Sequence, residues 1–490
     1  MFNIGVEWLD NINELIEKYK SIEAINHAKR LMFWDMETVM PPSGIEERSE
    51  VLSNIENYQK KMYLELKDLV DKIEENDDYS KAIKRILNKQ IHYYSSLPDE
   101  INKEITKISA IAESVWKIAK NRNNFKIVEP YLEKIVDLEI KISEYLGYKK
   151  HPYDALLDNY EEDFTVDDGD KIFDYLIKET KGMIDKVKDK EFLKIQKIKN
   201  EKYKKEWMVS ISNDLKNIFK IPENKFRIDE SVHPFTINIS PDDVRITTKY
   251  ELIDFKKSLF ATIHEMGHAI YLLNINKEYG CTPLYSSPSF GFDESQSRFL
   301  ENFVGKSKEF TEFIYPILKK RLPFIKKYDV DEIYYYFNNI DRTPIRIDAD
   351  ELTYNIHIAI RYDIEKNLIE GKYKVSEIPE IWDSKMEEYL GIRPKNYREG
   401  ILQDIHWYQG SFGYFPTYTL GNIIAAIIWY KIKNIKEHLI NGEFDQIFEF
   451  LKNNIHIYGS LYSPKELLKR SFNEDYNPEY LIKYFKEKFI

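Results

Sequence analysis

The amino-acid sequence predicts a mainly α-helical fold with one small antiparallel β-sheet. Glycine and proline number only 17 and 18 in 490 residues, and strand-rich folds need many of these turn residues. Apolar residues recur at helical spacing through most of the chain, and a single stretch alternates as β-strands do. No linker-like composition or fixed repeat divides the chain. We therefore expect a single domain over residues 1–490.

Stripes of apolar residues at a period of 3.6 predict the helices. Ile12 and Leu15, for example, lie on one face of a helix over residues 11–31. Asp167 and Asp168 are suitable helix starters before another stripe. The same periodicity predicts helices over residues 126–147, 167–187, 351–369, 420–440 and 464–471. We interpret these stripes as core faces and assign them no chemistry.

The exception is the stretch from Phe226 to Thr248. Its residues alternate between apolar and polar and are rich in Thr, Ile and Val, which is typical of strands. Turn residues stand at positions 240–243. We expect a hairpin or small antiparallel sheet over about residues 226–248. Because it comes just before the motif described below, it is expected to form one wall of a cleft.

Composition excludes several classes of function. The net charge is −11, and Asp and Glu interrupt every basic stretch, which argues against nucleic-acid binding. No stretch approaches the roughly 18 apolar residues of a membrane span. Cys281 is the only cysteine, so nothing calls for an oxidising compartment, and the N-terminal residues lack a signal-peptide pattern. We expect a cytoplasmic protein.

A short motif at residues 264–268, HEMGH, predicts a metal site. Positions i and i+4 of a helix share a face, so His264 and His268 can bind one zinc ion at roughly 2.0–2.1 Å. Glu265 stands beside them and can take a proton from metal-bound water. Gly267 costs a helix stability, so its presence indicates that another element packs closely against the backbone there.

A catalytic zinc needs a third protein ligand and one open position. The downstream segment FDESQSRFLENFVG offers carboxylates. Glu294 leaves room for a loop and a return onto a second helix, and the metal helices are expected within about residues 252–305. Glu301 and Asp293 are the alternatives. Glu301 stands about 10 Å further along a regular helix, so Glu294 and Glu301 are not expected to be ligands together.

Further blocks follow one another along the chain, and together they carry a family resemblance. They are WDMETVMP at 34–41, YDALLD at 153–158, HPF at 233–235, DVRIT at 243–247, IRIDAD at 345–350 and GILQDIHW at 400–407. With HEMGH, they resemble the thermostable carboxypeptidase family, also called the carboxypeptidase Taq family, over nearly the whole chain. Two departures stand out. Asp293 replaces the histidine of the family's usual HES/GQ block, and the stretch after Tyr160 lacks the family's glycine turn.

The resemblance implies a two-lobed helical body with a deep active-site groove, similar to neurolysin and angiotensin-converting enzyme. We also expect an N-terminal helical lid over about residues 1–110, with Trp34 and Asp35 packing it over the groove. The implied function is a zinc-dependent carboxypeptidase that removes single residues from free peptide C-termini with broad specificity. One zinc ion per subunit, cobalt as an accepted substitute, Glu294 as third ligand and a homodimer are further implications.

The expected mechanism assigns roles to four residues. Glu265 accepts a proton from the attacking water and passes it to the leaving amine. The oxyanion needs a hydrogen-bond donor beside the metal. His406 in the QDIHW block is the first candidate for this donor. Tyr414 and Tyr418, in the Gly-rich aromatic loop that follows, are the next candidates.

An exopeptidase must also recognise a free carboxylate, which arginine does best. Arg346 lies between apolar neighbours and is either paired with a carboxylate such as Asp350 or turned to the cleft as the anchor. Arg245 in the predicted sheet is the alternative anchor, unless it pairs with Asp243. His233 is expected to belong to the wall of the substrate site.

Two other functions stay open from the sequence. A groove open at both ends would make the chain an oligopeptidase or endopeptidase of the same class. A metal-binding interaction protein without activity is the second alternative. Glu265 argues against the second, because inactive relatives of enzymes commonly lose such a base.

Overall fold

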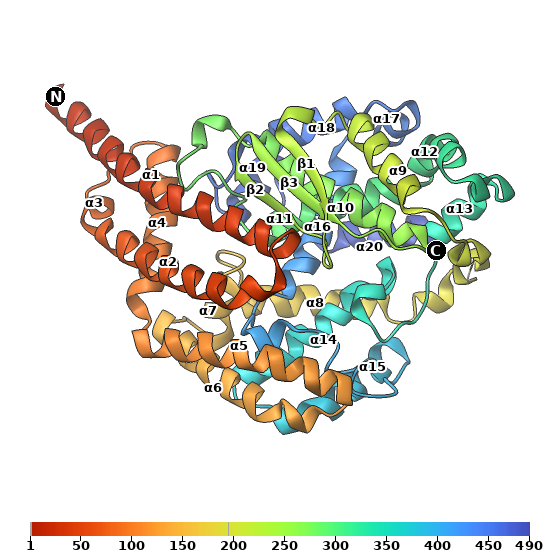
Figure 1. Ribbon diagram of the computed structural model, residues 1–490, viewed down its shortest axis with the longest axis horizontal. Coiled ribbons are helices and arrows are strands. Elements are labelled where there is room, and N and C mark those ends of the chain that lie inside the picture. The colour runs from red at the N-terminus through yellow and green to blue at the C-terminus, as the bar shows by residue number, and fades with distance from the viewer. Residues whose placement is uncertain (1, 195) are drawn as a thin grey trace. The chain divides into compact units, whose positions relative to one another are not determined.

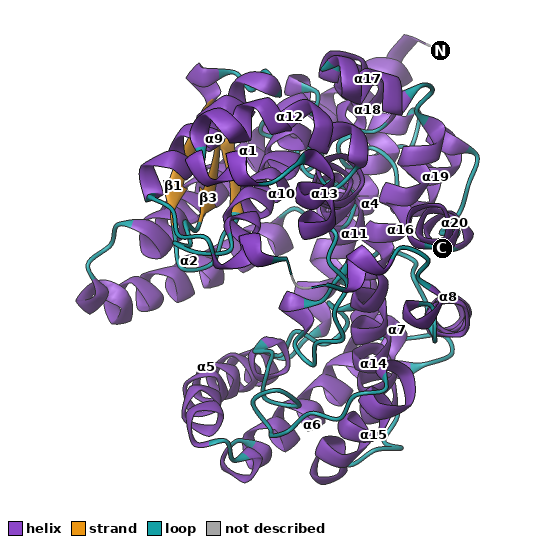
Figure 2. Cartoon of the chain, turned by 90° about the vertical axis from the view of Figure 1, so that its right-hand side faces the viewer, coloured by secondary structure: helices purple, strands orange, loops and turns teal. Residues whose placement is uncertain are grey.

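The computed structural model describes residues 2–194 and 196–490, and these residues are mostly helical (Figure 1; Figure 2). The chain divides into two compact units, each made of three separate stretches. Unit 1 comprises Met1–Ser95, Lys197–Phe337 and Ile428–Asn473, and unit 2 comprises Ser96–Gln196, Asn338–Ile427 and Glu474–Ile490. The single-domain assignment and the implied groove and lid stay predictions.

Unit 1 holds the sheet and more than half of the helices. Its helices are α1 (Phe2–Thr38), α2 (Ile45–Glu65), α3 (Lys67–Asp71), α4 (Asp78–Ser96), α9 (Lys205–Ile218), α10 (Phe255–Asn274), α11 (Phe290–Arg298), α12 (Lys308–Arg321), α13 (Val330–Phe337), α17 (Ile435–Asn441), α18 (Phe444–Asn454) and α19 (Pro464–Phe472). A π-helical segment, Phe299–Gly305, continues α11 directly.

Unit 2 is helical in the residues that the structure describes. Its helices are α5 (Asp99–Arg122), α6 (Glu129–Leu146), α7 (Pro152–Asp158), α8 (Val166–Thr180), α14 (Glu351–Ile369), α15 (Ile378–Leu390) and α20 (Glu479–Phe489). The chain passes from unit 2 to unit 1 within α16 (Pro416–Lys431).

The sheet has three strands in the order β1-β3-β2 and lies against α10 (Figure 1). The strands are β1 (Phe226–Glu230), β2 (Thr236–Ser240) and β3 (Asp243–Thr248). β2 and β3 pair antiparallel with Thr236 opposite Ile246, as the predicted hairpin requires. β1 pairs parallel with β3, so the sheet is mixed and the fully antiparallel prediction was wrong. Alternation identifies the strands and their faces, but it carries no information on strand direction.

Most predicted helices match observed ones. The range 351–369 coincides with α14, and 126–147 with α6 to within a few residues. The helix predicted over 420–440 is two helices, because Asn434 adopts the left-handed conformation with φ 53° between α16 and α17. Thr165, rather than Asp167 or Asp168, caps α8, and Asp168 closes its capping box.

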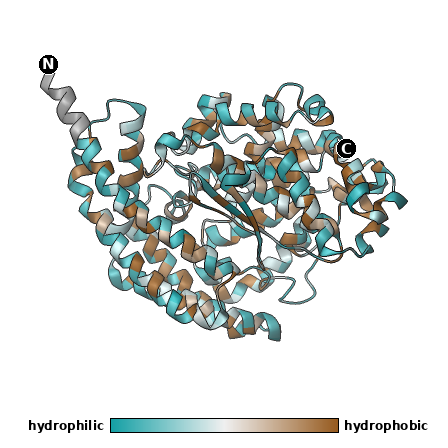
Figure 3. Cartoon of the chain, turned by 45° about the horizontal axis from the view of Figure 1, so that its top comes forward, coloured by the Kyte–Doolittle hydropathy of each residue, from teal (hydrophilic) through white to brown (hydrophobic). Residues whose placement is uncertain are grey.

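Hydrophobic and hydrophilic residues alternate along most helices, as the mixed brown and teal colouring of Figure 3 shows. In unit 1, α1 (through Leu15 and Ile22) packs with α3 and α4 around a buried apolar cluster. Of the helices among the described residues, none combines the length and the apolar character of a membrane span. The apolar stripe of residues 11–31 is thus a core face in the fold, as predicted.

Candidate metal centre

The HEMGH motif lies in the middle of α10, between the sheet and α11. Gly267 is buried, and a Cβ atom there would stand 2.6 Å from the backbone oxygen of Gln296 and 2.7 Å from Cα of Ser297. Such distances are too short for any side chain, so α10 and α11 meet backbone to backbone. The close contact predicted from Gly267 is confirmed, and it brings Glu294 of α11 next to the two histidines.

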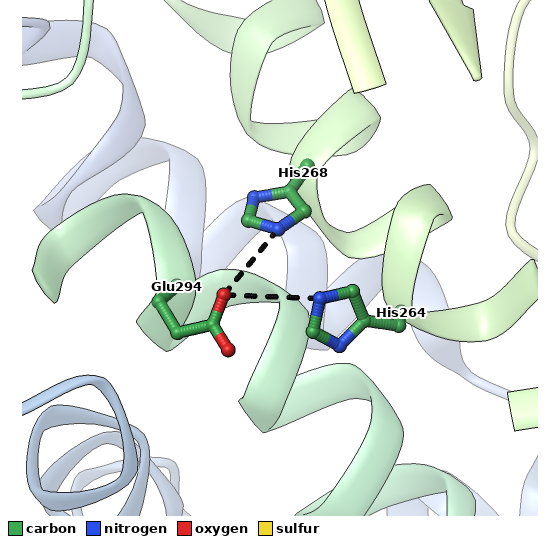
Figure 4. Close-up of side chains that lie close together, drawn as sticks. All are labelled: His264, His268 and Glu294. Carbon is green, nitrogen blue, oxygen red and sulfur yellow. Dashed lines mark ion pairs between the residues drawn. The ribbon is translucent and has the colours of Figure 1, made fainter. Parts of the chain in front are cut away.

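Figure 4 shows His264, His268 and Glu294, which we call the metal centre, pointing toward one another. Nε2 of His264 and Nε2 of His268 lie 3.8 and 3.7 Å from Oε2 of Glu294. Two atoms bound to one ion at about 2.1 Å lie at most about 4.2 Å apart. Both glutamate–histidine distances are within this limit, and the three ligand atoms gather within 4.8 Å of one another. This donor set fits a metal ion.

A carboxylate faces the outer ring nitrogen of each histidine. Nδ1 of His264 lies 2.9 Å from Oε2 of Glu301, and Nδ1 of His268 lies 3.2 Å from Oδ1 of Asp293. Carboxylates in this position orient an imidazole so that its Nε2 is presented to a metal. Asp293, whose role was open from the sequence, is thus an outer partner of His268. Glu301, the alternative ligand, contacts the side of His264 opposite to Glu294.

Arg298 and Lys306 hold the carboxylates in place. Nε of Arg298 donates to Oε1 of Glu294 at 2.6 Å, while its NH1 lies 3.6 Å from Oε2 of Glu301. Nζ of Lys306 donates to Oε1 of Glu301 at 3.1 Å. Because Arg298 occupies Oε1 of Glu294, Oε2 of Glu294 is the oxygen left facing the histidines.

The charges in this cluster keep both glutamates ionised. Burial opposes the ionisation of Glu294, but Arg298 and the two imidazoles outweigh it and lower its pKa. Burial likewise opposes the ionisation of Glu301, yet Lys306 and His264 hold its pKa well below the usual range. Burial disfavours the protonated form of His268, but Asp293 and its neighbours raise the pKa of His268 to about 9. The site therefore has an electrostatic preference for a cation.

Glu265 lies beside the metal centre with its side chain buried. It is 6% exposed, and burial raises the pKa of its carboxyl, although the flanking imidazoles and a hydrogen bond oppose the shift. The hydrogen bond comes from Oγ1 of Thr236 in β2, at 2.6 Å from Oε2. A raised pKa brings a carboxylate closer to the range in which it can accept a proton at neutral pH.

The two sheet candidates for substrate binding lie in unit 1. Nε and NH2 of Arg245 donate to the two carboxylate oxygens of Asp243 at 2.8 and 2.7 Å, which is the pairing considered from the sequence. The same guanidinium lies over the Trp34 ring, 4.7 Å from its centroid. Trp34 therefore fastens α1 to the sheet. His233 stands exposed in the loop between β1 and β2.

Arg346 lies in unit 2 and pairs with Asp404 rather than with Asp350. Its Nε and NH2 donate to Oδ1 of Asp404 at 3.1 and 2.9 Å, and Oδ2 of Asp404 accepts from the fully buried Arg361. Asp350 instead caps α14. Two guanidinium groups thus share one carboxylate, which leaves one positive charge in excess among these three side chains.

The oxyanion candidates also lie in unit 2. The rings of His406 and Tyr414 stack with centroids 5.6 Å apart, and Tyr418 meets Tyr414 edge-on at 5.3 Å. Burial lowers the pKa of His406 to about 4, and Arg346 adds to the shift while Asp404 opposes it. The imidazole is neutral at pH 7, so one of its nitrogens carries a hydrogen and can donate.

Sequence reasoning missed the roles of three residues around the centre: Thr236, Arg298 and Glu301. Arg298 stands four positions after Glu294 on the same helix, a spacing at which opposite charges meet. That signal was available in the sequence. The contacts of Thr236 and Glu301 join elements distant in sequence, and no local pattern reports them.

The family model of the carboxypeptidase Taq (M32) metallopeptidases matches residues 14–489. The chain is 40% identical to thermostable carboxypeptidase 1 of Pyrococcus furiosus, over 98% of this chain and 99% of that protein. It is 36% identical to carboxypeptidase 1 of Bacillus subtilis, over 97% of each.

Solved structures give the same answer for the fold. The P. furiosus carboxypeptidase (Apo-Mg) structure superposes with a TM-score of 0.96 at 41% identity, over 98% of this chain and 99% of that one. Metallocarboxypeptidase 1 of Trypanosoma cruzi superposes with a TM-score of 0.92 at 29% identity, over 98% and 99% of the two chains. The chain is a metallocarboxypeptidase and belongs to the carboxypeptidase Taq (M32) metallopeptidase family.

Proposed function

We propose that the chain is a zinc-dependent carboxypeptidase that releases single C-terminal residues with broad specificity, with Glu265 as general base. The observation that carries the proposal is the convergence of two imidazole nitrogens and one carboxylate oxygen beside a buried glutamate. A site with two imidazoles and one carboxylate suits zinc or cobalt, whereas magnesium and calcium prefer oxygen ligands.

A metal ion held by His264, His268 and Glu294 would polarise the scissile carbonyl and activate a water molecule. Glu265 takes the proton of the attacking water and delivers it to the leaving amine, whose bond to the carbonyl carbon then breaks. Arg298 and the outer carboxylates keep the ligand atoms in position for the ion.

Two further roles are parts of the proposal. Donation to the oxyanion is assigned to His406 first, with Tyr414 and Tyr418 as the alternatives, and the neutral imidazole of His406 supports this order. Recognition of the substrate carboxylate is assigned to Arg346, because the Arg346–Arg361–Asp404 group has one positive charge in excess. Arg245 is the weaker candidate, since Asp243 balances its single positive charge, whereas one carboxylate, Asp404, is shared by two arginines.

Glu265→Gln tests the role of the base. The amide cannot accept the proton, so turnover should fall about 100- to 10,000-fold, while metal content, measured by elemental analysis, stays that of the parent. Glu278→Gln makes the same change at an exposed position just beyond α10 and should keep full activity. Equal activity of Glu265→Gln and the parent would refute the base assignment.

Two peptides with blocked N-termini distinguish an exopeptidase from an oligopeptidase or endopeptidase. One peptide has a free C-terminus and the other a C-terminal amide. Mass spectrometry should show loss of one residue at a time from the free acid and little cleavage of the amide. Internal cleavage of both peptides would favour the endopeptidase. A cytoplasmic location and a homodimer stay predictions, the first from the lone cysteine and the second from the family resemblance.

A further inference from the structure

The small sheet makes a direct contact with the proposed general base. Oγ1 of Thr236, the first residue of β2, lies 2.6 Å from Oε2 of Glu265 and 3.1 Å from the Glu265 backbone oxygen. Within residues 2–194 and 196–490, Thr236 is the residue that donates a hydrogen bond to this carboxylate. Oε2 is therefore anchored, and Oε1 is the oxygen left to accept a proton.

The backbone of Thr236 is held in place by pairing with β3. Thr236 stands opposite Ile246 in the antiparallel pair. The preceding residue, Phe235, exchanges two hydrogen bonds with Thr247: its backbone nitrogen donates to Oγ1 at 3.0 Å, and its oxygen accepts from the Thr247 nitrogen at 2.8 Å. A β-branched side chain on a paired strand has few accessible rotamers. The hydroxyl is thus a fixed reference point beside the helix.

We propose that Thr236 is a positioning residue that fixes the orientation of the Glu265 carboxylate for proton transfer. The proposal rests on the proposed role of Glu265 as base. The terminal torsion of a glutamate is broad, so without the hydroxyl the carboxylate can rotate and present Oε1 less often to the attacking water. In this proposal, the three-stranded sheet contributes the Thr236 hydroxyl, which orients the general base Glu265.

Thr236→Val and Thr236→Ser test this role. Valine keeps the branched shape and removes the hydroxyl, so kcat should fall about 10- to 100-fold, the loss expected when a reacting group is misplaced. KM and metal content should stay those of the parent, because no metal ligand or substrate contact is changed. Thr236→Ser keeps the hydroxyl group and its hydrogen bond to Glu265. Its kcat should therefore lie within about threefold of that of the parent.

The combination with Glu265→Gln separates this proposal from the proposed function. If Thr236 acts through Glu265, Thr236→Val should cause no further loss in the Glu265→Gln background. Full activity of Thr236→Val, with Glu265→Gln inactive, would overturn the positioning role alone. Full activity of Glu265→Gln would refute the proposed role of Glu265 as general base. A Thr236→Ser variant as slow as Thr236→Val also contradicts the proposal, and Thr236→Ala must reproduce the loss if the valine variant fails to fold.

Discussion

Arg298 is the residue that joins the two glutamates around the metal centre. Its Nε donates to Oε1 of Glu294 at 2.6 Å, and its NH1 lies 3.6 Å from Glu301. Arg298→Met leaves the buried Glu294 carboxylate without this donor and free to turn. We expect the zinc dissociation constant, measured by competition with a chromophoric chelator, to rise about 10- to 100-fold, as is usual when a partner of a metal ligand is removed.

Arg321→Met is a matched control for this change. Nε of Arg321 donates to Oδ2 of Asp214, also at 2.6 Å, but Asp214 is not among the proposed ligands. Zinc affinity should be unchanged in this variant. A loss of affinity that is equal in both variants would point to a general effect of losing an ion pair and would contradict the specific role of Arg298.

The sequence predicted the residues of the candidate metal centre, but not the residues that contact them. HEMGH is informative because i, i+4 geometry on a helix is fixed by the backbone, whereas Glu294 was preferred over Glu301 and Asp293 through the family resemblance. The partner of Asp293 could not be derived, because it depends on how α11 is rotated against α10. Arg346 shows the same limit: Asp404, its partner, lies far along the chain, and the sequence offered the nearby Asp350 instead.

At the scale of elements, the contact between α10 and α11 depends on Gly267. In Gly267→Ala the new Cβ would meet two backbone atoms of α11 closer than 3.0 Å, at Gln296 and Ser297, and a backbone cannot move aside as a side chain can. We expect a loss of about 1–3 kcal/mol in the free energy of unfolding, seen in urea denaturation. Zinc affinity should fall as well, because the candidate ligand Glu294 is part of α11 and would be displaced with it.

Gly44→Ala is the control for this substitution. The nearest atom to a Cβ at Gly44 is Sδ of Met40 at 3.6 Å, an ordinary contact. Its stability should stay within about 0.5 kcal/mol of the parent. If Gly267→Ala proved as stable as Gly44→Ala, with unchanged zinc affinity, the close approach of α10 and α11 would not be needed for the centre.

Helices were easier to predict than the connections between them. The long periodic segments predicted α14 to the residue and α6 to within a few residues, because a core face repeats along the whole element. The π-helical segment Phe299–Gly305, which carries Glu301, has no such signature. The direction of β1 was missed for a related reason, since strand pairing is a property of two segments and not of either one.

At the scale of the whole molecule, unit 1 is completed by a stretch that returns from late in the chain. His456 in that stretch is 1% exposed. Its Nε2 donates to Oε1 of Gln296, 2.9 Å away on α11, and Nδ2 of Asn274, on α10, donates to its Nδ1 at 3.4 Å. A neutral imidazole satisfies both contacts, whereas a second proton on Nδ1 would face a donor. Protonation of His456 would thus disturb the contacts that join this late stretch of the chain to α10 and α11.

His456 therefore makes stability depend on pH in a defined direction. Burial, aided by Lys452, lowers the pKa of His456 to about 3, against about 6.5 in an unfolded chain. Between these values the unfolded chain binds a proton that the folded chain does not, so this contribution to stability is complete above about pH 6.5 and declines by up to ~1.4 kcal/mol per pH unit below it. In His456→Gln the decline in the free energy of unfolding from pH 6.5 to 4.5, measured by urea denaturation, should be smaller by roughly 2 kcal/mol over these two pH units. The same decline in variant and parent would show that His456 is protonated in the folded chain.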